Sequence, residues 1–240
     1  MTRTRSRLTS LSSLVLAVAC SAGAAVAEEP KTDLSAIKAP QPTVPEVFTL
    51  MGQYVRVAYN NEGYVVLGYR LANASVGEDW MYLQAGVTLR EGVKNQKLKP
   101  AAFSVKTPDG KTIPMATQKE YAEAGYLPAL NQRGKITKDP LNYFPVGTSH
   151  ACALQFFADL GSGPGRLAYD EVELSDNRAC VGRLFFKIPG KITTGQHWLI
   201  VKFESTEVQV PFRILTKEED KMLRKSWEDL KKALDEDMLK

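Results

Sequence analysis

Histidine is scarce in this 240-residue chain, which removes the commonest catalytic acid–base group and metal ligand. The two histidines, His150 and His197, stand alone, without a second histidine or a cysteine at metal-ligand spacing. No Gly-x-Ser-x-Gly motif is present, and the glycine-rich stretch 161–165 lacks the Gly-Lys-Ser/Thr that would hold a phosphate. The sequence therefore predicts no catalytic residues, no metal and no cofactor. It favours a protein that is not an enzyme, and a hydrolase with an unrecognised site is the alternative.

An excess of charge is nearly absent as well. The chain has 31 basic and 27 acidic residues, but three of the arginines, Arg3, Arg5 and Arg7, lie within residues 1–27, where there is no acid. Removing them leaves 28 basic against 27 acidic residues. Because nucleic acid binding needs a concentrated basic surface, we expect no nucleic acid partner.

No apolar run is long enough to span a bilayer, which takes ~20 residues. Residues 1–27 instead have the parts of a secretory signal: the arginines, a short apolar run at 14–19, and small residues at 25 and 27, the −3 and −1 positions of a cleavage site after residue 27. We therefore predict export to the periplasm or beyond, and no transmembrane helix after cleavage. The alternative is that 17–20 is a bacterial lipobox, so that a lipid on Cys20 anchors the protein to the membrane.

Cysteine is also rare. Removal of the signal leaves Cys152 and Cys180, and an even pair in an exported protein predicts a disulfide. Both lie on the apolar side of an alternating segment, so both thiols should face one core. Closing a loop of ~28 residues would stabilise the fold by about 3–4 kcal/mol in the chain-entropy model. Two unpaired buried thiols are the alternative.

The mature chain divides into three parts. Residues 28–50 contain several prolines and are predicted to be a flexible linker. Residues 51–215 alternate between apolar and polar side chains, which predicts many short strands with one apolar face each. This pattern is typical of antiparallel sheets in an all-β sandwich or barrel, and we favour the sandwich. Pro211 lies within the last strand, which predicts an edge strand or a bulge there. The expected strands are 54–59, 64–72, 82–90, 102–107, 111–115, 151–157, 169–174, 180–188, 197–204 and 206–215.

Two capping boxes interrupt the strands. Thr117 and Glu120 predict a short helix around 118–124, and Thr216 and Glu219 predict a C-terminal helix within 216–240. The second helix has a single apolar stripe, which could pack on its own domain, bind a partner or self-associate. The stripe comprises Leu223, Trp227, Leu230 and Leu234.

Residues 116–150 form a long insertion between predicted strands, and long insertions in compact domains are often functional. Four aromatic residues mark this insertion as a candidate partner-binding segment, because tyrosine combines a large rigid surface with a polar tip. The alternative is that they cap one open end of the sandwich. They are Tyr121, Tyr126, Tyr143 and Phe144.

Four strand segments carry a resemblance to a known family. They read Cys-Val-Gly-Arg-Leu-Phe-Phe-Lys-Ile-Pro at 180–189, Leu-Ile-Val-Lys-Phe at 199–203, Val-Gln-Val-Pro-Phe at 208–212 and Tyr-Val-Val-Leu at 64–67. Over 52–215 the chain resembles bacterial exported immunoglobulin-like domains of unknown function, which are often lipoproteins. The resemblance implies an immunoglobulin-like sandwich and supplies no catalytic residues; the insertion and the terminal helix depart from it.

These observations lead to one functional hypothesis and one further alternative. We expect a non-enzymatic binding module of the cell envelope that recognises a protein or an envelope polysaccharide through its loops and the 116–150 insertion. The alternative is a structural accessory subunit that docks into an envelope assembly through the C-terminal helix.

Overall fold

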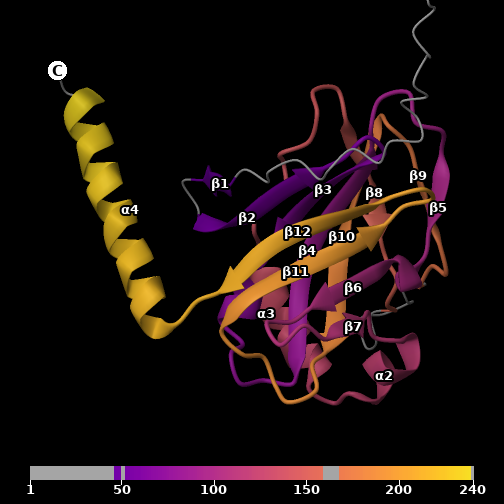
Figure 1. The fold of residues 1–240 in the computed structure, drawn as a ribbon, viewed down its shortest axis with the longest axis horizontal. Helices are drawn as coiled ribbons and strands as arrows, with labels where there is room; N and C mark the ends of the chain where they lie inside the picture. The colour runs from indigo at the N-terminus through magenta and orange to yellow at the C-terminus, as the bar shows by residue number, and fades with distance from the viewer. Residues whose placement is uncertain (1–45, 50–51, 159–167, 239–240) are drawn as a thin grey trace, which may run out of the picture. The chain divides into compact units, whose positions relative to one another are not determined.

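The structure is a computed structural model that describes residues 46–49, 52–158 and 168–238 (Figure 1). The chain divides into two compact units, Met1–Ile37 and Lys38–Lys240, and the described residues all belong to the second. The predicted signal 1–27, Cys20 and most of the predicted linker 28–50 therefore lie outside the described residues.

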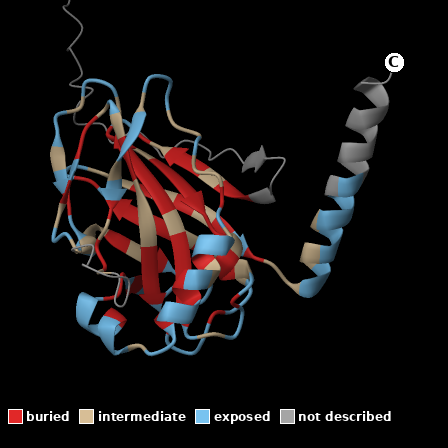
Figure 2. Cartoon of the chain, turned by 180° about the vertical axis from the view of Figure 1, so that it is seen from behind, coloured by how far each residue is buried: buried red, intermediate tan, exposed pale blue. Residues whose placement is uncertain are grey.

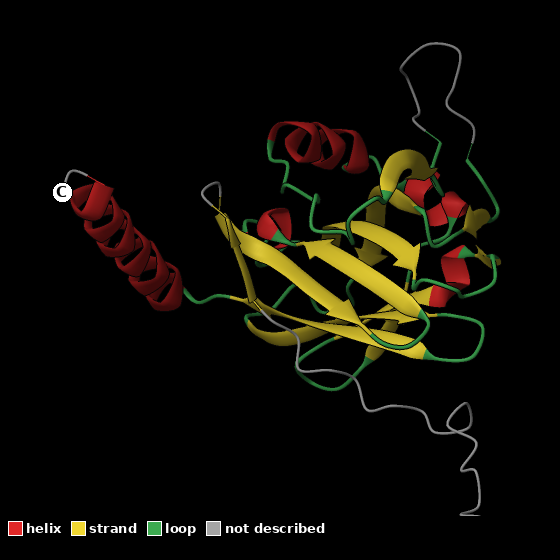
Figure 3. Ribbon diagram, turned by 90° about the horizontal axis from the view of Figure 1, so that it is seen from above, coloured by secondary structure: helices red, strands yellow, loops and turns green. Residues whose placement is uncertain are grey.

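The chain is 41% strand and 21% helical, so the prediction of a mostly β protein is confirmed, and the sheets do not close into a barrel (Figure 3). One sheet has six strands in the order β1 (Glu46–Thr49), β2 (Gly52–Tyr59), β3 (Gly63–Gly68), β4 (Trp80–Leu89), β10 (Arg178–Lys187) and β8 (Ser149–Leu154). A second has four, in the order β12 (Glu207–Ile214), β11 (Gly195–Lys202), β6 (Phe103–Lys106) and β7 (Thr112–Pro114). A small third sheet pairs β5 (Gln96–Leu98) with β9 (Val172–Leu174).

The helical segments are short except for the last. They are α1 (Arg70–Asn73), the 3₁₀ helix η1 (Pro100–Ala102), α2 (Gln118–Glu123), α3 (Leu127–Ile136) and α4 (Lys217–Met238). Both predicted capping boxes are present: the Glu120 N–H donates to the Thr117 hydroxyl at 3.2 Å, and the Glu219 N–H donates to the Thr216 hydroxyl at 3.1 Å.

Buried residues follow the strands of both larger sheets (Figure 2), and most of them belong to one hydrophobic cluster. The alternation of apolar and polar residues along the strands supplies this cluster, because every second residue of a strand faces the same side. Val65 and Leu67 of β3 enter it from the six-stranded sheet, and Val210 and Phe212 of β12 from the four-stranded sheet. Pro211 lies between these last two on β12, which is an edge strand, as the sequence predicted.

One strand pair departs from the expected antiparallel arrangement. β8 runs parallel to β10, with Cys152 opposite Cys180 and Ala153 opposite Val181. Parallel neighbours need a long connection, and the more than 20 residues between β8 and β10, which include β9, provide it. The predicted disulfide joins this pair: Cys152 and Cys180 are bonded, with the second fully buried.

Three local predictions differ from the structure. Residues 46–49, assigned to the linker, form β1 on the edge of β2. The strand expected over 64–72 ends at Gly68, because the Arg70 N–H donates to Asp139 and α1 begins there. Helix α3 was not predicted, since a proline and a glycine weaken its pattern; the proline lies in the first turn, where its missing N–H is harmless.

Candidate functional site: a cleft between the 116–150 insertion and the six-stranded sheet

The 116–150 insertion lies directly on the six-stranded sheet: its first part joins the main cluster through Tyr121, Leu127 and Leu130, and its residues 139–144 cover a separate part of the sheet. Two glycines of this face make the close approach possible. A Cβ at Gly68 would lie 2.7 Å from Cβ of Asp139, and a Cβ at Gly86 would lie 2.3 Å from Cζ of Phe144. Any larger residue at either position would push the insertion off the sheet.

A second, smaller hydrophobic cluster fills the contact between the insertion and strands β2 and β3. It contains buried valines of the sheet, with Leu141, Tyr143 and Phe144 of the insertion packed against them, half-buried. The valines are Val55, Val57 and Val66. Two of the four aromatic residues proposed to bind a partner therefore pack on their own domain.

Helix α3 packs in the same way on β4. Its Gly134 lies against the ring of Tyr82, where a Cβ would be 2.5 Å from Cζ, and that ring packs edge-on against Phe185 at 5.3 Å between centroids. Tyr121, on α2, is 4% exposed, and its hydroxyl accepts a hydrogen bond from Nδ2 of Asn131 at 2.7 Å. Tyr121 thus belongs to the core. The insertion covers a sheet face, whereas the sequence suggested the cap of an open end.

Tyr126 is the exposed member of the four aromatic residues, with 42% of its surface accessible. Its hydroxyl donates to Glu78 at 2.8 Å and accepts from Arg133 at 2.7 Å. Arg133 also forms an ion pair with Glu78 at 2.9 Å, so this cluster ties α3 to the segment before β4.

A cleft of 730 Å³ opens where the insertion does not fully cover the sheet. Its floor comprises β4 and β10, with Gln84 and Arg183, and His150 of β8 lies beside them. Its wall comprises the end of α3, with Lys135, and the segment 138–142, with Lys138. Elements far apart in the sequence therefore meet around one cleft, which Leu141 and Val181 line together with the polar side chains.

A β-bulge directs His150 to this cleft. Between Ser149 and Cys152 β8 advances three residues while its partner β10 advances two, from Arg178 to Cys180. The extra residue reverses the alternation, because a bulge changes which face the following side chains point to. His150 can then line the cleft, packed edge-on to Phe144 at 5.2 Å, while Cys152 faces Cys180.

Gln84 joins the floor of the cleft to the segment 138–142. Its Oε1 accepts the Asp139 N–H at 2.8 Å, and its Nε2 donates to the Tyr82 hydroxyl at 3.2 Å. Burial raises the pKa of Tyr82 above its ordinary value, so the hydroxyl stays protonated at neutral pH. Arg183 is oriented in turn by a hydrogen bond from its Nη1 to Oδ1 of Asn131 at 2.5 Å.

Asp139 is the one acidic residue of the lining, and Arg70 occupies its carboxylate. Oδ2 accepts the Arg70 N–H and Oδ1 accepts Nε, each at 3.0 Å. Burial raises the pKa of Asp139 above its ordinary value, although the donors of Arg70 act in the opposite direction. Asp139 thus joins α1 to the insertion. His150 lines the same cleft, but the two carboxylate oxygens of Asp139 accept their hydrogen bonds from Arg70.

His197, the other histidine, lies away from the cleft lining and is fully buried on β11. Its ring stacks on Phe212 at 5.3 Å, and Nδ1 lies 3.0 Å from the Gly195 carbonyl oxygen, to which it donates. Burial lowers the pKa of His197. This residue is part of the core.

The C-terminal helix α4 is tied to the β-domain at its first turn. The Tyr54 hydroxyl donates to Asp220 at 2.8 Å, and Arg213 forms an ion pair with Glu219 at 2.6 Å. Burial, followed by the hydrogen bond to Asp220, raises the pKa of Tyr54 to about 12. Leu223 of the predicted stripe is half-buried. The side chains of its other members, Trp227, Leu230 and Leu234, lie outside the described residues.

Sequence reasoning identified the insertion but missed the residues that line the cleft. Arg183 occupies a polar position of a strand, and Lys135 and Lys138 belong to a helix end and loop that no motif marked. Their convergence depends on the path of the insertion across the sheet, which alternation does not encode. The available signal was a polar residue, Arg183, within the predicted strand 180–188.

A comparison of the chain with protein-family models, with curated proteins and with solved structures gives no match. Among the described residues, no group of three or more histidine, cysteine, aspartate or glutamate side chains is arranged to hold a metal ion. Within the same part of the chain, no helix combines the length and the apolar character needed to cross a bilayer.

Proposed function

We propose that this chain is a non-enzymatic, exported binding module of the bacterial cell envelope. Its ligand enters the cleft between the 116–150 insertion and the six-stranded sheet. The observation that carries the proposal is the cleft itself, a space of 730 Å³ in which polar side chains from separate elements meet apolar ones such as Leu141 and Val181. Ligand sites typically measure about 300–1,000 Å³ and contain a few fixed polar groups.

The framework of the proposal is an immunoglobulin-like β-sandwich. Support comes from the single hydrophobic cluster shared by the two larger sheets and from the family resemblance over 52–215. Export is supported by the secretory pattern of residues 1–27 and is compatible with the Cys152–Cys180 disulfide, because such bonds persist in oxidising compartments.

Binding without catalysis is favoured by how the cleft side chains are engaged. The Asp139 carboxylate is held by Arg70, and the Gln84 amide joins β4 to the segment that contains Asp139. These contacts fix the shape of the site, and rigid polar groups favour recognition because little ordering is needed when a ligand binds.

The proposal is tested by filling the cleft. Asn142 lines it and is exposed, so Asn142→Trp should block entry while the fold is retained. Gln132→Trp is the matched control, because Gln132 is exposed on α3 and outside the lining. Fractionated envelope polysaccharides and proteins are passed over the immobilised mature chain and both variants.

We expect a fraction that the wild type and Gln132→Trp retain and Asn142→Trp does not, with equal melting temperatures. Equal retention by all three proteins, or no retention by any of them, would contradict the proposal.

The accessory-subunit hypothesis remains the second proposal, supported by the attachment of α4 at its first turn through Asp220 and Glu219. Deletion of 217–240 separates the two. If the cleft carries binding, the truncated chain keeps the ligand. If α4 carries it, the truncated chain loses its partner while its β-domain still unfolds cooperatively.

A further inference from the structure

We propose that the protein forms a weak dimer in which β8 pairs with β8 of a second copy of this chain. β8 is the last strand of the six-stranded sheet, and it pairs with β10 on one side, while no described strand pairs with its other side. An edge of this kind presents main-chain N–H and C=O groups that can bind a further strand. The inference goes beyond the proposed function and does not depend on it.

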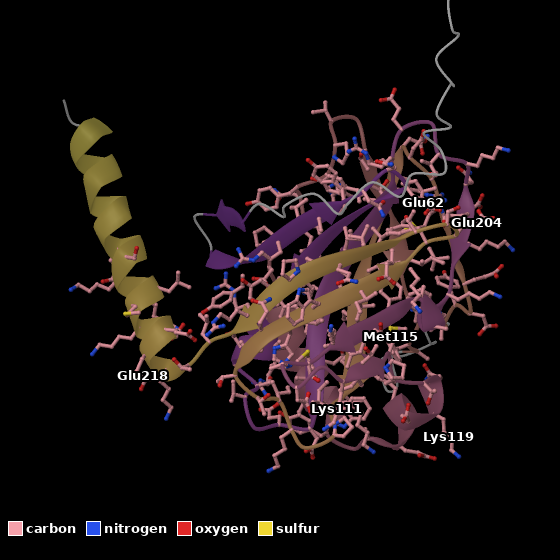
Figure 4. The ribbon with its side chains drawn as sticks, in the orientation of Figure 1. Glu62, Lys111, Met115, Lys119, Glu204 and Glu218 are labelled. Carbon is pink, nitrogen blue, oxygen red and sulfur yellow. A yellow bond between two sulfur atoms is a disulfide. The ribbon has the colours of Figure 1, made fainter. Side chains whose placement is uncertain are left out.

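The other edges of the two larger sheets are protected. Proteins prevent pairing at an edge with proline, with charged side chains or by keeping the strand short. β12 contains Pro211 and begins at Glu207. β7 has three residues, begins directly after the charged Lys111 and ends at Pro114 (Figure 4). β1 has four residues and begins at Glu46. β8 has six residues and contains no proline, lysine, arginine, aspartate or glutamate, so it lacks these forms of protection.

The bulge in β8 restricts the pairing to the later part of the strand. It lies between Ser149 and Cys152, and a bulge discourages pairing because it twists the edge. From Cys152 to Leu154 the register with β10 is regular. Ala151 and Ala153 are exposed and have small side chains, so a second main chain can approach there. The ladder between the two copies is therefore short.

Two-fold symmetry favours a second copy over an unrelated peptide. In an antiparallel pairing about a two-fold axis, the beginning of one strand lies beside the end of the other. An exposed apolar side chain lies near each end of β8. Val146 precedes the strand and is fully exposed, and Tyr169, which is 50% exposed, donates its N–H at 2.7 Å to the carbonyl of Gln155 directly after the strand. The pairing brings Val146 of one copy toward Tyr169 of the other at both ends, and no like charges meet along β8.

The dimer should be weak, because its ladder is small. Four to six residues at about 3.3 Å each span roughly 13–20 Å, and interfaces that bury less than about 1,200 Å² are typically weak. A two-fold axis perpendicular to the sheet turns the same face of both copies to one side. The two clefts then open on the same side of the joined sheet, so a ligand with repeated units reaches both and binds with higher apparent affinity.

The test is sedimentation equilibrium of residues 28–240 between about 1 μM and about 500 μM. The variant is Ala151→Lys/Ala153→Lys, because both side chains are exposed and the two-fold axis brings the added lysines together. The control is Ala122→Lys/Ala129→Lys, which adds the same charge at exposed positions of α2 and α3. Melting temperatures at the lowest concentration check that both variants are folded. Hydrogen exchange of the 149–154 amides, measured at both ends of the concentration range, locates the contact.

We expect the wild type and the control to approach twice the monomer mass as the concentration rises. The β8 variant should associate at least about tenfold more weakly, because like charges on paired strands repel each other. Protection of the 149–154 amides should increase with concentration in the wild type and not in the β8 variant. Deletion of 217–240 should leave the association unchanged, which separates strand pairing from self-association of α4.

A wild type that stays monomeric at the highest concentration overturns the inference, and so does equal association of the wild type and the β8 variant. Loss of association on deletion of 217–240 would assign the contact to α4 and overturn it as well. A monomeric chain whose 149–154 amides are protected only by another envelope protein would assign this edge to that partner instead. None of these results decides the proposed function, which the comparison of Asn142→Trp with Gln132→Trp tests separately.

Discussion

Replacing Gly134 with alanine sets helix propensity against packing. Within a helix, alanine is more favourable than glycine by about 1 kcal/mol, so α3 on its own should gain stability. In the structure, the added Cβ would lie 2.5 Å from Cζ and 2.7 Å from the hydroxyl oxygen of Tyr82. That ring is 2% exposed and packs edge-on against Phe185, so it cannot simply swing away. Overpacking of this kind costs about 1–3 kcal/mol, and we expect a net loss of about 1 kcal/mol.

The measurement is urea unfolding of residues 28–240 followed by circular dichroism, with a thermal scan in which about 1 kcal/mol corresponds to roughly 2–4 °C for a domain of this size. Gly125→Ala is the matched control, because a Cβ there has open space and its φ is not positive; it should be neutral or slightly stabilising. In a Tyr82→Leu background, Gly134→Ala should become less destabilising or even stabilising. A Gly134→Ala protein that is more stable than the wild type would show that α3 does not pack on Tyr82.

Three further predictions concern the framework. Replacing Cys152 and Cys180 together with alanine should lower the free energy of unfolding by about 3–4 kcal/mol, measured in urea against the oxidised wild type; a loss below about 1 kcal/mol would contradict the role of the bond in restricting the unfolded chain. Burial lowers the pKa of His197, so as the pH falls the unfolded chain takes up a proton on this residue before the folded chain does. The contribution of His197 to the free energy of unfolding should therefore be complete above its ordinary pKa of about 6.5 and be lost as the pH drops below that value. Unfolding curves between pH 8 and 5 should lose part of this slope in His197→Phe, and equal slopes in this variant and the wild type would refute the assignment. Thr117→Ala should cost about 1 kcal/mol through loss of the α2 cap, and no change in the urea midpoint would show that the cap is dispensable.

The strands were largely predictable because alternation reports directly on which residues are buried. Val208, Val210, Phe212 and Ile214 alternate with polar neighbours, and all four are buried on β12. The disulfide followed from the same parity rule together with an even cysteine count. The capping boxes were equally local, since a threonine and a glutamate three residues apart satisfy each other without help from the rest of the chain.

The cleft was not predictable, because it depends on packing between elements rather than on a local pattern. Gly68 and Gly86 look unremarkable within their strands, yet they decide where the insertion approaches the sheet. The bulge in β8 depends on the pairing with β10, which places His150 and Cys152 on opposite faces. Neither feature leaves a mark in a hydrophobic pattern of period two.

The valines of β2 show where the sequence signal ends. Val55, Val57 and Tyr59 alternate along β2 and so share one side of it, and the structure places this side under Leu141 and Phe144 rather than in the main cluster. Alternation shows that a face is covered but not which segment covers it. Because the insertion supplies that cover, removing it would expose the valines and lower stability as well as open the cleft. Deleting 116–150 therefore cannot separate a binding role from a structural one, whereas substitutions at Asn142, Lys135 and Lys138 can, since their side chains are exposed at the rim.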